Sequence, residues 1–443
     1  MIPLSESALT LCILCIVLVP LTIAGLALIN AGLGRSHSAA HVMLASLCVF
    51  AVSASVYMIC GFAWQGYGGG AGHSITIGGK PWNLLGGEGF LMHGLKFDGT
   101  APALTAWLQM FSVGLAAVIP LGAGLDRWKL SASCASAALL AGWTYPLFAH
   151  WVWGGGWLAQ LGSNYGVGRG FVDAGGTSTI QIVGGLTALA MAWILGPRSG
   201  KYNHEGMPSA IPGHNGVFIL AGCFLASVGW LGLNCAGAIL FAGAEPRQVP
   251  LIGVNTILAA GGAALVAALL THYRFGRPDL SICANGWIGG LAAGSAGCVF
   301  VSPAEMLLIG IVAGVLVTYS VDWFELNCRV DDPGGTVSAH AVAGFWGLLA
   351  VAIFGQFADA GANATAGAGA AAASGQWLAQ VAGIATLLGF VLPLTYGLNF
   401  ALNRILPQRV VREGERQGLD LYELGAGAYP EFVIHSDEFT QLH

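Results

Sequence analysis

Two matching stretches carry the residues best suited to chemistry in an otherwise apolar chain. The first, "DAGGTSTIQIVGG", covers 173–185, and the second, "DPGGTVSAHAVAG", covers 332–344. They align without a gap, and Gln181 in the first stands where His340 stands in the second. A histidine can take up or release a proton near neutral pH, whereas a glutamine amide only donates and accepts hydrogen bonds. The repeat therefore predicts a paired polar site with one proton-carrying group.

The composition predicts a membrane protein. Only 8% of the 443 residues are charged, 56% are apolar, and the mean hydropathy is +0.72. Soluble domains carry about 25% charged residues, so this chain has too few to cover a surface that faces water. The net charge of −5 offers no basic surface for nucleic acid. The ten cysteines lack a matching set of Cys or His partners, so neither a metal site nor a disulfide framework is predicted.

Apolar runs of about 20 residues predict eleven transmembrane helices in an all-α polytopic protein. The predicted spans are 8–32, 41–65, 102–124, 130–155, 178–197, 212–235, 249–272, 281–301, 304–323, 335–356 and 376–402. The first span lacks a preceding basic segment, so it is expected to be retained rather than cleaved as a signal peptide.

The distribution of Lys and Arg predicts the orientation. With the N-terminus outside, 12 of these residues lie on the inner side and 4 on the outer side. Because Lys and Arg favour the cytoplasmic side, the N-terminus is predicted outside and the C-terminus inside. The transmembrane domain then covers 1–402, followed by a cytoplasmic tail over 403–443. The low-complexity segment 358–375 is expected to be an outer loop.

The matching stretches open two spans that run in opposite directions. Asp173 precedes the inward span 178–197, and Asp332 precedes the outward span 335–356. Antiparallel copies of one phrase indicate an inverted repeat, with a site where the halves meet near the midplane. The halves are predicted over about 8–197 and 212–356, with 376–402 as an extra helix.

Gln181 and His340 are expected to meet in the middle of the membrane. Each lies eight residues after its aspartate, which corresponds to roughly 12 Å of helix. A polar pair at that depth lines a cavity or pairs internally, and we interpret it as a functional site. The alternative is a structural hydrogen bond that joins two helices.

Nearly the whole chain resembles the ammonium transporter (Amt/Mep/Rh) family, and most closely its Amt-like branch. The resemblance rests on motifs that include "GAGLDRWKLSA", "YPLFAHWVWGGGWL", "GHNGVFILAGCFLASVGWLGLN" and "RVDDPGGTVSAHAVAGFWGLLA". It implies a multi-pass protein of the cell membrane, embedded in lipid, that forms a homotrimer with one pore per subunit. The family consists of transporters without cofactors rather than enzymes.

The resemblance also assigns roles to individual residues. Trp153 matches the aromatic residue that holds ammonium at the outer mouth by a cation–π contact. Asp173 matches the aspartate that stabilises this outer site, and His340 matches the second pore histidine. Phe111 matches the first gate phenylalanine after a shift of one residue.

Several positions depart from the family pattern. Gln181 replaces the first pore histidine, Leu233 replaces the second gate phenylalanine, and Gly237 replaces a serine at the mouth. Asn234 follows Leu233 and is a weaker pore candidate. His150 lies three residues before Trp153, where it either orients the outer site or forms a packing hydrogen bond.

The resemblance predicts transport of ammonium or ammonia, and two alternatives stay open. The altered pore could serve an ammonium sensor with little conduction, or a channel for a neutral gas as in the Rh branch. A haem-binding redox enzyme is disfavoured, because only His340 is a histidine at membrane depth. In the family a PII-type regulator docks near the tail, and the changed residues in "LYELGAGAY" leave that partner open.

Overall fold

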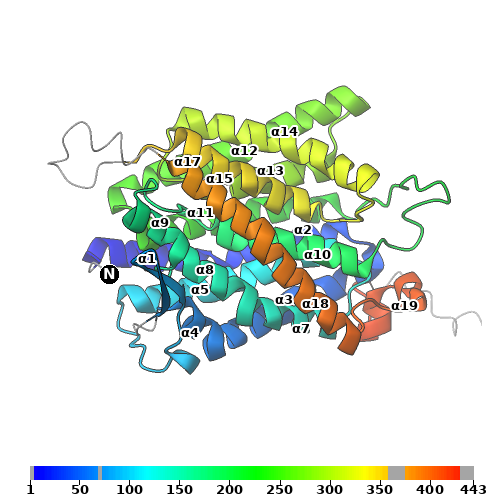
Figure 1. The fold of residues 1–443 in the computed structure, drawn as a ribbon. Coiled ribbons are helices and arrows are strands. Elements are labelled where there is room, and N and C mark those ends of the chain that lie inside the picture. The colour runs from blue at the N-terminus through cyan, green and yellow to red at the C-terminus, as the bar shows by residue number, and fades with distance from the viewer. Residues whose placement is uncertain (1–3, 68–71, 358–374, 430–443) are drawn as a thin grey trace, which may run out of the picture.

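A computed structural model describes residues 4–67, 72–357 and 375–429 as a bundle of long helices (Figure 1). The helices of the first half are α1 Glu6–Leu18, α2 Pro20–Leu33, α3 Ala39–Val56, α4 Phe62–Gln65, α5 Ala101–Val118, α6 Leu121–Gly124, α7 Leu130–Leu139, α8 Tyr145–Val152, α9 Trp157–Tyr165 and α10 Val183–Leu195. Those that follow are α11 Gly216–Ala242, α12 Val249–Phe275, α13 Leu280–Ser295, α14 Pro303–Asn327, α15 Ala343–Phe354, α17 Gln376–Thr386, α18 Leu392–Ile405 and α19 Arg412–Gln417. The predicted extra span is thus α17 and α18.

Within the described residues, nine helical stretches are long and apolar enough to cross a membrane. The chain is therefore a polytopic helical membrane protein. Two predicted spans are not among the nine. The span predicted over 281–301 is α13, which has 16 residues, and the span predicted over 130–155 consists of α7, a π-helical turn and α8.

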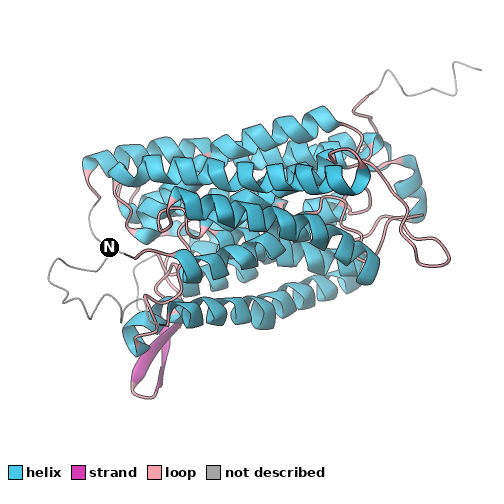
Figure 2. Ribbon diagram, turned by 90° about the horizontal axis from the view of Figure 1, so that it is seen from above, coloured by secondary structure: helices cyan, strands magenta, loops and turns pink. Residues whose placement is uncertain are grey.

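A small β-hairpin departs from the helical expectation within the described part of the loop 66–101. Strand β1, His73–Ile77, pairs antiparallel with strand β2, Lys80–Leu85, across a Gly78–Gly79 turn. The hairpin projects from the bundle at the same end as the N-terminus (Figure 2). Helix α9 was also not predicted, because nine residues are too short for a span. The predicted loop 358–375 lies almost wholly outside the described residues.

The two helices that follow the matching stretches lie inside the bundle and run in opposite directions. Helix α10 ends, and α15 begins, at the end of the bundle where the tail helix α19 lies (Figure 1). The side chain of Arg198, just after α10, donates two hydrogen bonds to Asp331, just before α15, at 3.0 Å each. These contacts fix the end of one central helix beside the start of the other.

Buried charges at this end of the bundle hold the loops together. Asp126 and Arg127 are adjacent in the sequence but bond to different partners. Asp126 accepts a hydrogen bond from Arg198 at 3.1 Å, whereas Arg127 donates to the backbone carbonyls of Gly196 and Asp331 at 2.8 and 2.7 Å. Asp126 has a positive φ of 68°, a backbone conformation that is uncommon outside glycine.

Candidate substrate path

Both matching stretches fold into a π-helical turn at the start of their central helix. The turns cover Thr177–Ile182 and Val337–Val342, and they contain Gln181 and His340 respectively. A glycine with positive φ precedes each turn at the same position of the repeat, namely Gly176 at 92° and Gly335 at 61°. Since this backbone conformation strongly favours glycine, both copies retain one there. π-Helical turns are rare and are frequently found at functional sites.

The two turns pack against each other through equivalent residues. A Cβ atom added to Gly185 would lie 2.6 Å from the backbone nitrogen of Ala341. A Cβ atom added to Gly344 would lie 2.6 Å from Cγ1 of Ile182. In the repeat, Gly185 corresponds to Gly344 and Ile182 to Ala341. The two contacts therefore join corresponding residues of the two stretches, and the small residues allow the helices to approach closely.

Gln181 and His340 meet where the two turns pack, as the sequence predicted. The Nδ1 atom of His340 lies 2.8 Å from Oε1 of Gln181. The exposed fractions of the two residues are 0% for Gln181 and 4% for His340. Because the amide oxygen only accepts, Nδ1 carries the hydrogen, and Nε2 of the neutral ring is left as an acceptor. The amide nitrogen of Gln181 is buried without a partner among the described residues.

Trp230, on α11, packs against His340 and was missed by the sequence analysis. The two ring centroids are 6.5 Å apart with planes 20° from parallel. The indole Nε1 donates to Oγ of Ser295 at 2.8 Å, and the tryptophan is fully buried. The indole therefore lies nearly parallel to the imidazole beside the Gln181–His340 pair. The sequence feature that could have indicated Trp230 is its position in "GWLGLN", three residues before Leu233.

Asp173 organises the turn that leads to Gln181. Its carboxylate accepts hydrogen bonds from the backbone N–H groups of Gly176, Thr177 and Ser178 at 2.7–2.9 Å, and from the Ser178 hydroxyl at 2.6 Å. Its backbone carbonyl accepts from the Trp153 Nε1 at 2.7 Å. With both carboxylate oxygens occupied, this aspartate acts on its surroundings through the turn and through Trp153.

Phe241 is a second residue that the sequence analysis missed. Its ring stacks on Trp153 with centroids 4.2 Å apart and planes 9° from parallel. One face of the indole is thus covered, so a cation can use only the other face. The predicted span 212–235 ended too early to include Phe241, because α11 continues to Ala242.

The three residues that the resemblance assigns to the gates and the mouth lie in different environments. Phe111 stacks on Phe50 at 5.9 Å and contacts Trp107 at 6.5 Å, on a half-buried face of α5. Leu233 is buried in α11. Gly237 lies so close to the preceding loop that an added Cβ would be 2.7 Å from the Ala174 carbonyl oxygen. The missing serine at this position therefore accompanies a tight helix–loop contact.

The two weaker candidates make packing contacts. Asn234 donates to the Thr256 hydroxyl at 3.0 Å, while its amide oxygen is buried without a partner among the described residues. His150 contacts the backbone oxygen of Gln65 at 3.0 Å and the Asn83 side chain at 3.1 Å. The histidine thus connects α8 to α4 and to the hairpin, which favours the packing interpretation of His150.

Comparison with known proteins identifies the family to which this chain belongs. The profile of the Ammonium Transporter Family matches residues 10–429. The chain belongs to the ammonium transporter family. Ammonium transporter Amt2 of Archaeoglobus fulgidus is 33% identical over 431 residues, which cover 96% of this chain and 89% of the relative. The ammonium transporter of Bacillus subtilis is 30% identical over 421 residues, which cover 94% and 97% of the two chains.

Solved structures of this family share the fold. A protein described as "Sensor Amt Protein" superposes with a TM-score of 0.82 at 26% identity, covering 94% of this chain and 98% of that one. Mep2 of Candida albicans superposes with a TM-score of 0.77 at 22% identity, covering 97% and 91%. The helical bundle is therefore that of the family.

Proposed function

We propose that this chain transports ammonium across the cell membrane along a path that contains Gln181 and His340. The observation that carries the proposal is the buried hydrogen bond between these side chains at the crossing of the two helix starts. A polar pair at membrane depth is costly unless it lines a path or a cavity. The transporters among its relatives favour transport over sensing.

The chemistry of ammonium requires the path to separate a proton from ammonia. Moving an ammonium ion into a medium of low dielectric constant costs far more than moving neutral ammonia. In the neutral pair, His340 Nε2 accepts a hydrogen bond and the free Gln181 amide nitrogen donates one. Ammonia can exchange hydrogen bonds with both, whereas only His340 can carry the proton. We therefore propose that Gln181 changes the coupling between proton and ammonia movement.

We further propose that Trp153 and the turn held by Asp173 recruit ammonium at the outer mouth. Gly237 supplies no hydroxyl there, Leu233 no aromatic ring, and Phe241 covers one face of Trp153. Loss of one hydrogen bond to a charged group, worth about 1.5–3 kcal/mol, raises the half-saturating concentration by roughly ten- to a hundredfold. Phe111 is the gate residue that we propose for this path.

The architecture that accompanies this function is also proposed. Eleven spans place the N-terminus outside and the tail inside, with halves over 8–197 and 212–356 and an extra helix over 376–402. Three subunits are proposed to associate, each with its own path. A PII-type regulator is the partner proposed for the inner tail.

Uptake of ammonium in cells that lack their own carriers tests the proposed function. Cells that express the wild-type chain should grow on limiting ammonium, and cells that express His340→Ala should lose most of this growth. A matched control is Trp193→Phe, which changes an exposed side chain at the far end of α10. Wild-type protein that is correctly inserted but gives no uptake would contradict transport and favour sensing.

A further inference from the structure

A cavity of about 450 Å³ lies between the tail and the loop that follows α10. The residues of its lining that matter for its chemistry are Arg198, Ser199, Gly200, Arg409, Arg412 and Glu415. Three of these six are arginines, and they come from two segments that are far apart in the sequence. Arginine side chains gathered around one cavity favour a ligand with negative charge.

The carboxylate of Glu415 already accepts hydrogen bonds from other residues of the lining. Glu415 Oε1 accepts from the Ser199 backbone N–H at 2.5 Å. Its Oε2 atom accepts from the Ser199 hydroxyl at 3.0 Å and from Arg409 Nη2 at 2.8 Å. Arg198 is likewise committed, since it donates to Asp331 and Asp126. Neither Glu415 nor Arg198 therefore sets the charge that the cavity offers to a ligand.

The free positive charge comes from Arg412 on the tail, because Arg409 forms an ion pair with Glu415 at 2.8 Å. Arg412 is exposed and forms no ion pair within the described part of the chain. Arg409 uses Nη1 on the Leu195 carbonyl at 2.8 Å and Nη2 on Glu415, which leaves further N–H groups of its guanidinium available. A guanidinium presents its donors in a planar fork that fits two oxygens of a phosphate group.

We propose that this cavity binds a phosphate group, carried either by a free phosphate compound or by the headgroup of an anionic phospholipid. The position gives such a ligand a structural consequence. Arg409 already bonds the carbonyl of Leu195, the last residue of α10, and Arg127 bonds the carbonyl of Gly196. A phosphate held by Arg409 and Arg412 therefore lies on the tail segment that Arg409 already attaches to the end of α10.

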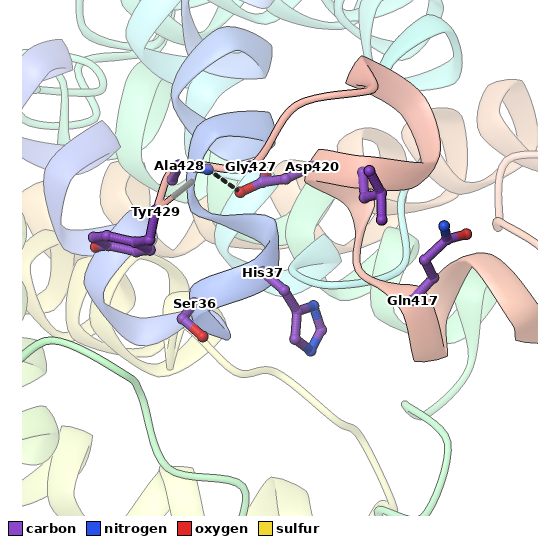
Figure 3. A pocket seen from close by; sticks show the side chains of 8 residues that line it. Ser36, His37, Gln417, Asp420, Gly427, Ala428 and Tyr429 are labelled. Atoms are coloured by element: carbon purple, nitrogen blue, oxygen red, sulfur yellow. Dashed lines mark hydrogen bonds between the residues drawn. The ribbon is translucent and has the colours of Figure 1, made fainter. Parts of the chain in front are cut away.

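A second cavity on the same tail provides an internal comparison. It has a volume of about 390 Å³ and lies between the tail and the loop at Ser36 and His37 (Figure 3). Its lining contains neither lysine nor arginine within the described residues. Asp420 in its wall accepts hydrogen bonds from the N–H groups of His41 and Ala428. The same chemistry therefore predicts phosphate at the first cavity and not at the second.

Calorimetric titration of the purified full-length protein with inorganic phosphate tests the proposal, with ionic strength held constant by chloride. The wild type should bind phosphate, and Arg412→Gln should weaken binding by roughly ten- to a hundredfold, because one charge-assisted contact is lost. Arg416→Gln is the matched control, since Arg416 is exposed on the same helix but does not line the cavity. This control should bind as the wild type does.

A second arm distinguishes the two sources of the phosphate group. Each variant is reconstituted in bilayers of phosphatidylglycerol or phosphatidylcholine, and its thermal unfolding is measured. Stabilisation by phosphatidylglycerol that is lost in Arg412→Gln, without calorimetric binding of inorganic phosphate, identifies the lipid headgroup. Binding of inorganic phosphate identifies the free compound. Absence of both responses, or equal losses in Arg412→Gln and Arg416→Gln, overturns the proposal.

Discussion

The segments that lead from Asp173 and from Asp332 into the two π-helical turns are alike in backbone structure. They differ in the hydrogen bonds that the two aspartate side chains accept. Asp173 accepts four hydrogen bonds of 2.9 Å or less within its turn. Asp332 accepts one, from the Val337 N–H at 2.7 Å, and its Oδ1 atom is buried without a partner among the described residues. The repeat thus preserves the geometry of both turns, while the first has the more complete hydrogen bonding. The first turn contains the non-titrating Gln181, and the second contains the titratable His340.

Removal of the two aspartates should give the largest difference between the halves. Asp173→Ala leaves several buried donors unpaired at about 1–3 kcal/mol each, so we expect a loss of at least about 3 kcal/mol in stability. Asp332→Ala leaves one donor unpaired and removes an unpartnered oxygen, so a loss below about 2 kcal/mol is expected. Thermal unfolding of the purified variants measures both. Equal losses would show that the number of hydrogen bonds does not distinguish the turns.

The paired glycines should give a smaller difference. A Cβ added to Gly185 meets the backbone nitrogen of Ala341, whereas one added to Gly344 meets the side chain of Ile182. A side chain can move aside more readily than backbone, so within the about 1–3 kcal/mol typical of overpacking Gly185→Ala should cost more than Gly344→Ala. The same unfolding measurements apply. A larger cost for Gly344→Ala would contradict the contact geometry at the crossing.

Titration of Asp332 should give a difference that depends on pH. Burial raises the pKa of Asp332 to about 6, whereas an aspartate in an unfolded chain has a pKa of about 3.9. The folded state then binds more protons between these values, so the stability contributed by this group falls as the pH rises from about 4 to about 6. The unfolding temperature of the wild type relative to Asp332→Asn should fall over that range and level off above it. A difference that rises with pH would have the wrong sign.

Long-range regularities of the sequence predicted the framework of the molecule. Nine of the eleven predicted spans followed from apolar runs, and the contact between Gln181 and His340 followed from two matching phrases. The spans and this contact both depend on the spacing of a few residue types, because a membrane span needs a fixed length and a repeat preserves its register.

Local details of the path could not be read in this way. The π-helical turns depend on how the chain settles against its neighbours, and an apolar run has the same composition in either helix type. Phe241 was missed because the predicted span ended seven residues before Ala242. The hairpin was not predicted because a glycine-rich sequence allows a tight turn as readily as an open loop.

Current recordings on membranes that contain the wild type or Gln181→His test the central claim most directly. Pulses of ammonium are applied over pH 5–8 to equal amounts of inserted protein. If Gln181 and His340 form the conducting pair, a second imidazole adds a proton-carrying group and changes the pH response or the charge moved per ammonium. Currents, selectivity and pH response that are the same in both proteins would contradict the account.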